Sequence, residues 1–141
     1  MSLVADQGGE LIGHVAFSPV SLDSPAGAGA GLVATGATGA SAGRGAGLAP
    51  LAVLAAHRKR GMGAALVRAG LDACMTAGFS WVVVLGAPAY YGRLGFRSAA
   101  MAGLRDEYGG GPAFQALELR PGSLPLGEGL VRYAAEFASL P

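Results

Sequence analysis

The 141-residue chain carries little charge and no excess of one sign. Ten Lys plus Arg oppose nine Asp plus Glu, which leaves a formal net charge of +1. This balance excludes a broad attraction to nucleic acid or to an anionic membrane surface, so partners must be recognised by local sites. Hydrophobic residues make up 52% of the chain and charged residues 13%, which excludes a wholly disordered protein. We therefore expect a single domain, residues 1–141, with one hydrophobic core.

Cysteine and long apolar runs are also scarce. The lone cysteine, Cys74, excludes an intrachain disulfide framework. The longest nearly apolar run, residues 46–56, is far shorter than the ~20 residues that a membrane-spanning helix needs. The first residues lack the basic start and apolar middle of a signal peptide, and no cluster of metal ligands is present. These absences predict a soluble, cytoplasmic protein without a metal.

One long segment has almost nothing large to bury. From Ser24 to Gly47 the chain consists mainly of Gly, Ala, Ser and Thr, which predicts a flexible loop at about 24–47. Residues 27–31 and 35–41 within it are similar to the Gly-rich turns of dinucleotide-binding proteins. Such a turn must join a buried strand to a helix, and neither flank has that pattern. A nucleotide-dependent oxidoreductase is therefore a weak alternative.

The hydrophobic patterns of the remaining chain predict a mixed α/β fold. Two β-prone runs, residues 2–6 and 10–17, flank a Gly-rich reversal and predict a hairpin in which Leu11, Val15 and Phe17 share one face. Further elements are expected at 48–54 (strand), 62–77 (helix), 81–85 (strand), 88–94 (short helix) and 114–119 (strand). The order strand, helix, strand predicts a parallel crossover.

Two irregular features of this sheet can be expected from the sequence. Pro50 interrupts the strand at 48–54 and has no N–H to donate, which predicts a bulge or an unpaired edge where the sheet opens. The strand at 2–6 is expected at an exposed edge, where it could pair with a second copy of the chain to form a homodimer.

The turn before the helix at 62–77 is the most informative segment. It holds three consecutive cations, Arg58, Lys59 and Arg60, followed by Gly61 and Gly63. Glycine lets the backbone approach a ligand closely, and the first N–H groups of a helix have no intrahelical acceptor. The helix dipole adds positive potential. The segment predicts a phosphate or pyrophosphate site, with a solvated loop and tightly packed glycines as an equal alternative.

Two motifs at matching spacing resemble the GNAT N-acetyltransferase superfamily. Leu51-Ala52-Val53 followed by Arg58-x-x-Gly61-x-Gly63 resembles its acetyl-CoA signature, and residues 91–96 resemble its Tyr-x-x-x-Gly-Phe segment. Residues 13–19 and 85–91 are similar to its YhbS-type bacterial branch. The resemblance implies a GNAT-type mixed, splayed β-sheet with a crossover helix. It also implies an N-terminally truncated chain, because family members usually begin with a strand and helices that wall the acceptor site.

The resemblance also implies a cofactor site. Acetyl-CoA would be the co-substrate, its pantetheine arm bound by strand backbone and its pyrophosphate bound by the basic turn. The residues involved would be Leu51, Ala52, Val53, Arg58, Lys59, Arg60, Gly61, Met62 and Gly63. The chain departs from the pattern at two positions: Val84 stands where the family has Asn, and Ala87 stands where the branch commonly has Asp.

By the same resemblance, Tyr91 would protonate the departing thiolate as general acid, with Tyr90 as its partner in the core. A Tyr91 that is only packed beneath the short helix is the alternative. The chain would transfer an acetyl group directly to a primary amine of a small molecule or peptide. A truncated, non-catalytic acyl-CoA-binding module is the alternative function.

No general base is evident from the sequence. His14 and Glu10 share a strand face, although a lone strand histidine is more often structural. Asp106 and Glu107 lie in an expected loop that could approach a substrate. Cys74 lies within the expected helix, so it reads as a small buried hydrophobe and not as a nucleophile.

Overall fold

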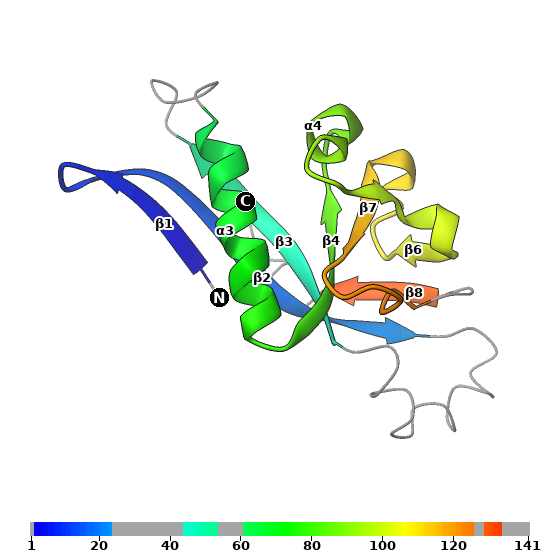
Figure 1. Ribbon diagram of the computed structural model, residues 1–141. Helices are drawn as coiled ribbons and strands as arrows, with labels where there is room; N and C mark the ends of the chain where they lie inside the picture. Colours follow the sequence, from blue (N-terminus) through cyan, green and yellow to red (C-terminus); the bar gives the residue numbers. More distant parts are fainter. Residues whose placement is uncertain (1, 24–43, 54–60, 126–128, 134–141) are drawn as a thin grey trace.

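The protein is described by a computed structural model that covers residues 2–23, 44–53, 61–125 and 129–133 (Figure 1). Its elements are β1 (Ser2–Gln7), β2 (Glu10–Asp23), β3 (Arg44–Val53), α3 (Met62–Thr76), β4 (Phe79–Leu85), α4 (Pro88–Gly92), β5 (Arg97–Ser98), η2 (Ala99–Ala102), β6 (Leu104–Asp106), η3 (Gly111–Ala113), β7 (Phe114–Glu118) and β8 (Gly129–Tyr133). Across these ranges the strands form one eight-stranded mixed sheet in the order β5-β7-β4-β3-β2-β8-β6, with β1 paired to β2. The expected α/β fold is confirmed.

The β1–β2 hairpin forms as predicted, but its faces differ from the simple alternation. Asp6 pairs with Leu11 and Ala5 pairs with Gly13, so Ile12 is an extra residue in β2. This bulge reverses the faces. Leu11 is 61% exposed and Ile12 only 2% exposed, so the prediction that Leu11 shares the buried face of Val15 and Phe17 is wrong.

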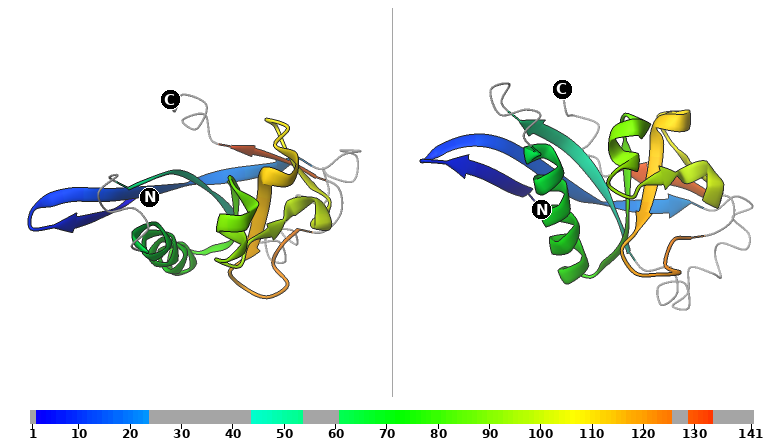
Figure 2. Two further views of the ribbon diagram at one scale, coloured as in Figure 1. Left: turned by 90° about the horizontal axis from the view of Figure 1, so that it is seen from above. Right: turned by 45° about the horizontal axis from the view of Figure 1, so that its top comes forward.

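The strand β2 is longer than predicted and has two partners on one edge. Its first half pairs with β1, and its second half, from Val20 to Asp23, pairs with β8. In both views of Figure 2 the β1–β2 hairpin extends away from the body of the sheet. The other edge of β1 has no strand beside it within the described residues.

The strand β3 begins before the point that the composition suggested. It starts at Arg44, so the expected loop at 24–47 ends too late; residues 24–43 lie outside the described part of the chain. Gly45 and Gly47 are needed in the strand because aromatic rings lie on them. A β-carbon at position 45 would collide with Trp81, and one at position 47 would lie 2.7 Å from a ring carbon of Tyr133.

Two hydrophobic clusters share the sheet through the central strand β4. Val82 and Val84 belong to the cluster that also contains the buried side chains of α3 and Tyr91 of α4. Trp81 and Val83 belong to the second cluster, which side chains of η2, β6, β7 and β8 complete. Because successive strand residues face opposite sides, β4 is buried on both faces, as its continuous apolar run predicts.

The helix α3 forms the expected crossover between β3 and β4, which are parallel. Gly78 ends it with a φ of 99°, a conformation that glycine adopts without strain, and its N–H donates to the Met75 carbonyl at 3.1 Å. None of the described helices is both long and apolar enough to cross a membrane.

Candidate functional site

The strands β3 and β4 form a pair that opens toward one end. Their parallel register ends where Leu48 lies opposite Val84. β3 continues beyond this point to Val53, and there it stays paired with β2, with Gly13 opposite Val53. In Figure 1 the two strands meet at their lower ends and separate upward, with α3 beside β3 and α4 above the end of β4. The splayed sheet that was expected is therefore present.

The opening begins at a bulge in β3. Between the pairs Phe17 with Leu48 and Val15 with Leu51, β3 advances three residues while β2 advances two. The extra residue falls in the segment that contains Pro50, whose missing N–H predicted an irregularity here. Beyond the bulge, the last residues of β3, including Leu51, Ala52 and Val53, are absent from the register with β4.

The N-terminus of α3 lies beside this opening. Gly61 precedes the helix with a φ of 77°, and its carbonyl accepts the Ala65 N–H at 2.9 Å. The N–H groups of Met62, Gly63 and Ala64 come before the first intrahelical bond, so they have no acceptor within the helix. The first turn contains no acidic residue. The cations Arg58, Lys59 and Arg60 lie outside the described residues.

Tyr91 is a buried phenol at the other side of the opening. It is 9% exposed, and its ring packs edge-on against Phe96 with centroids 5.6 Å apart. The ring also covers Gly86, where a β-carbon would collide with it. Burial raises the pKa of the Tyr91 hydroxyl above its ordinary value, and the neighbouring Tyr90 adds to the effect. The phenol therefore stays protonated at neutral pH.

Tyr90 packs against the core cluster that contains Tyr91, as expected, and it also reaches the surface of the opening. It is only partly buried, and the more deeply buried ring of the pair is that of Tyr91. The two rings meet edge-on with centroids 4.9 Å apart. A β-carbon at position 63 would lie 2.5 Å from the Tyr90 hydroxyl oxygen and 3.8 Å from Leu51 Cδ2. The structure thus brings β3, the first turn of α3 and α4 together at one point.

Gln115 of β7 supports this arrangement, and the sequence did not single it out. Its side chain is 2% exposed, and its Nε2 donates to the Gly86 carbonyl at 3.1 Å and to the Ala113 carbonyl at 3.3 Å. The Gly86 N–H donates to the same Ala113 carbonyl at 3.0 Å. These bonds fix the turn between β4 and α4, on which the Tyr91 ring rests. A polar residue within a buried strand was the available signal.

The N-cap of α4 is Ala87, where the related branch commonly has Asp, and it lacks a side-chain acceptor. Ala87 has an extended backbone and makes no side-chain cap. The helix instead begins with Pro88, whose fixed φ suits the first helical position. Val84, which stands at the family's Asn position, is 1% exposed in the core. It offers no polar contact toward the opening.

The side chains considered as general bases lie in different parts of the fold. His14 is half-buried in β2 with Ala52 of β3 opposite it, and Glu10 is exposed. Asp106 is buried, and its carboxylate accepts the N–H groups of Tyr108 at 3.0 Å and Gly110 at 2.7 Å. Only His14 is therefore placed next to the part of β3 that leaves β4.

The side chains of Glu107 and Cys74 are held by contacts within the fold. The Glu107 carboxylate accepts the Tyr133 N–H at 2.7 Å and lies 3.8 Å from Arg132 Nη1. Cys74 is fully buried in α3, and burial raises the pKa of its thiol to about 11. A thiol with this pKa is a poor nucleophile at neutral pH, as expected. Within the described ranges no three His, Cys, Asp or Glu side chains could hold a metal ion.

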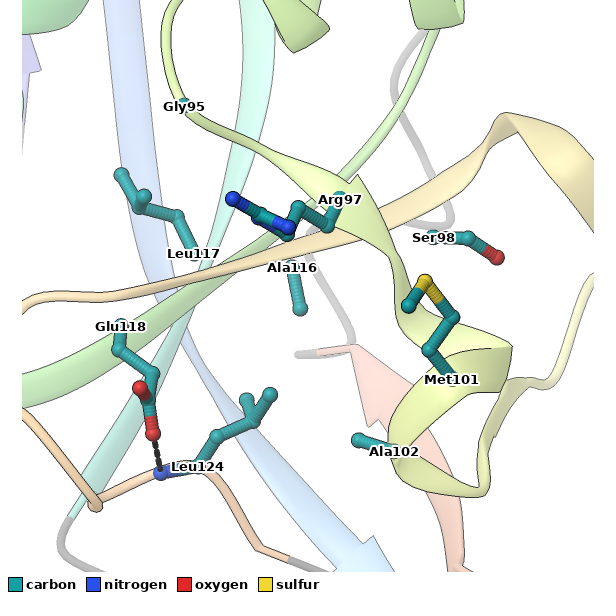
Figure 3. Close-up of a pocket in the computed structure, with 9 residues that line it drawn as sticks. All are labelled: Gly95, Arg97, Ser98, Met101, Ala102, Ala116, Leu117, Glu118 and Leu124. Carbon is teal, nitrogen blue, oxygen red and sulfur yellow. Dashed lines mark hydrogen bonds between the residues drawn. The ribbon is translucent and has the colours of Figure 1, made fainter.

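A separate hollow of about 410 Å³ lies over β5, β7 and η2 (Figure 3). Leu117 and Ala116 of β7 and Met101 of η2 contribute to its lining. The Glu118 carboxylate accepts the Leu124 N–H at 2.9 Å, which anchors the chain at its edge. The hollow contains none of the residues that the sequence predicted for the site.

Comparisons with known proteins place these features in context. Residues 1–96 match the acetyltransferase (GNAT) family. The chain is 39% identical over 139 residues to the uncharacterized N-acetyltransferase YhbS of Escherichia coli K12, covering 97% of this chain and 74% of that protein.

Two solved structures are similar over most of the chain. One is the GNAT family N-acetyltransferase YhbS from Escherichia coli in complex with CoA, with a TM-score of 0.77 and 37% identity, covering 99% of this chain and 70% of that one. The other is a GNAT family acetyltransferase from Brucella melitensis in complex with acetyl-CoA. Its TM-score is 0.66 at 34% identity, covering 96% of this chain and 67% of that one.

Proposed function

Because the chain belongs to the GNAT acetyltransferase family, we propose that it transfers the acetyl group of acetyl-CoA directly to a primary amine of a small molecule or peptide. The observation that carries this proposal is the separation of β3 from β4 beyond Leu48 and Val84, beside the N-terminus of α3. Two relatives more than 30% identical were solved with CoA or acetyl-CoA. We also propose that residues 1–141 act as one acetyl-CoA-binding domain in the cytoplasm.

The cofactor would bind along the opening. Backbone groups of Leu51, Ala52 and Val53 that face β4 have no partner in the β3–β4 register and would pair with the amides of the pantetheine arm. The pyrophosphate would lie at the N-terminus of α3, contacted by the segment from Arg58 to Gly63. Helix N–H groups and arginine side chains both suit this anion.

The chemistry needs few groups from the protein. The amine nitrogen attacks the thioester carbonyl carbon, a C–N bond forms, and the C–S bond breaks. A backbone N–H of β3 would stabilise the negative charge that develops on the carbonyl oxygen. Tyr91 would donate its proton to the departing sulfur and regain one from solvent, while the nitrogen loses a proton to water.

A ligand comparison tests the cofactor. Acetyl-CoA and CoA should each raise the melting temperature and NADPH should not, because a ligand that binds only the folded state stabilises it. Replacing both Arg58 and Arg60 with Ala should reduce the shift while the melting temperature without ligand stays unchanged. An NADPH shift larger than that of CoA would instead support the oxidoreductase alternative.

An assay of acetyl transfer tests the reaction itself. Purified protein with labelled acetyl-CoA and a panel of small primary amines and peptides should yield an acetylated product together with free CoA thiol. Binding of acetyl-CoA without transfer to any amine in the panel would contradict the catalytic part of the proposal and would leave an acyl-CoA-binding module.

We propose that the chain forms a homodimer through β1. Its outer edge has no strand partner within the described residues, and Val4 on β1 is 56% exposed. Open edges with apolar side chains favour pairing with another strand. Light scattering should show a dimer that Val4→Lys converts to a monomer; a monomer at all concentrations would contradict this.

A further inference from the structure

The phenol of Tyr90 lies where three parts of the proposed cofactor site meet. A β-carbon at position 63 would be 2.5 Å from the Tyr90 hydroxyl oxygen but 3.7 Å from ring carbon Cζ, so the oxygen is the atom that approaches the helix. The same point lies 3.8 Å from Leu51 Cδ2. Tyr90 thus reaches from α4 across the opening to the first turn of α3.

Gly63, which the Tyr90 hydroxyl approaches, lies at the end of α3 where an anion would bind. Gly63 is the second residue of α3, and its N–H belongs to the group that has no intrahelical acceptor. An anion bound by these N–H groups comes within reach of a hydroxyl that already lies beside Gly63. A phenol donates a hydrogen bond to a phosphate oxygen readily, because a charged acceptor strengthens the bond.

We propose that Tyr90 is a cofactor-binding residue whose hydroxyl donates a hydrogen bond to the pyrophosphate of acetyl-CoA at the N-terminus of α3. This inference rests on the proposed function. It gives the two adjacent tyrosines separate tasks: Tyr91 faces the sulfur, and Tyr90 joins α4 to the bound pyrophosphate.

Three ligands separate this role from simple packing. CoA and 3′-dephospho-CoA both carry the pyrophosphate, and acetylpantetheine carries no phosphate. Tyr90→Phe retains the ring and removes only the hydroxyl. Calorimetry should show CoA and dephospho-CoA weakened equally, by about 10-fold or more, the range for a hydrogen bond to a charged group. The affinity for acetylpantetheine, measured in the same way, should not fall, because this ligand has no phosphate for the hydroxyl to contact.

Tyr91→Phe is the matched control, because it removes the neighbouring hydroxyl. Its CoA affinity should equal that of the wild type. Equal losses for all three ligands in Tyr90→Phe would overturn the inference in favour of general packing, and so would no loss for any of them. A wild type that binds no CoA would overturn the proposed function and this inference with it.

The geometry can be checked without ligand. Gly63→Ala places a methyl group against the Tyr90 oxygen and should lower the melting temperature, although Ala favours helix over Gly. In the Tyr90→Phe background the nearest ring carbon is at ordinary contact distance, so Gly63→Ala should be neutral or stabilising. The same effect of Gly63→Ala in both backgrounds would show that the hydroxyl does not lie beside Gly63 and would overturn the inference.

Discussion

At the scale of single residues, Tyr91 is a buried phenol that stays protonated at neutral pH. The ring is held between Gly86 and Phe96, and burial raises the pKa of its hydroxyl above its ordinary value. A general acid must be protonated before it donates, and the Tyr91 phenol meets this condition throughout the neutral range.

Tyr91→Phe should therefore reduce turnover with little effect on acetyl-CoA affinity. The loss should be roughly 10²- to 10⁴-fold, the usual range for general acid catalysis. Initial rates and calorimetry on the same preparation would measure both quantities. A variant as fast as the wild type would remove Tyr91 from the mechanism without affecting the family assignment.

Position 61 requires glycine because of its backbone conformation, since a β-carbon there would meet no neighbouring atom of the described residues. Its φ is 77°, and the structure places no described atom within 4 Å of a β-carbon there. Gly61→Val should weaken CoA binding strongly, because a β-branched residue disfavours this conformation and would face the pyrophosphate. Gly61→Asn, which tolerates positive φ, should bind better than Gly61→Val in calorimetry. Equal affinities for both variants would contradict this explanation.

At the scale of elements, α3 depends on a close contact with β2. Gly70 lies against the ring of Phe17, which is 1% exposed, and a β-carbon there would collide with the ring. Gly70→Ala should lower the stability by about 1 to 3 kcal/mol through overpacking, against the ~1 kcal/mol that helix propensity alone would add. Chemical denaturation measures the difference. Ala69→Gly on the exposed face is the control, and it should cost only about 1 kcal/mol.

The elements that could be predicted are those whose signal is local. Periodicity predicted α3, the run at 81–85 predicted β4, and the missing N–H of Pro50 predicted the opening of the sheet. The start of β3 could not be predicted, because Gly45 and Gly47 belong in a strand only once Trp81 and Tyr133 lie on them.

The site was predictable to the same extent. The place of Gly61 and Gly63 at the start of a helix followed from local sequence signals, and anion binding at that helix N-terminus stays a prediction. The meeting of Tyr90 with Gly63 could not be found, because it depends on how α4 lies relative to α3. Gln115 was missed because its partners, Gly86 and Ala113, are brought together only by the folded sheet.

At the scale of the whole molecule, two buried phenols should make the free energy of unfolding fall at alkaline pH. Burial raises the pKa of Tyr133, with Asp106, Tyr108 and Glu107 adding to the effect, and burial also raises that of Tyr91. The unfolded chain loses these protons near pH 10, before the folded protein does. The stabilisation is therefore complete below pH 10 and is lost as the pH rises above it.

Urea denaturation at pH 8 and pH 10.5 should show this loss in the free energy of unfolding. Tyr133→Phe keeps the ring and removes one of the two titrating hydroxyls. Its free energy of unfolding should therefore decline less steeply between the two pH values than that of the wild type. A decline of the same steepness in both proteins would assign it to other groups.

The short β3–β4 ladder has a consequence for the exchange of amide hydrogens with solvent deuterium. Up to Leu48 the ladder is closed, whereas the groups of Leu51, Ala52 and Val53 that face β4 have no strand partner in that register. Amide hydrogens on that side should exchange quickly in the free protein, while those facing β2 exchange slowly. Acetyl-CoA should slow exchange in the fast set selectively. The protected amides would then show, residue by residue, where the cofactor pairs with β3 like an added strand of the sheet.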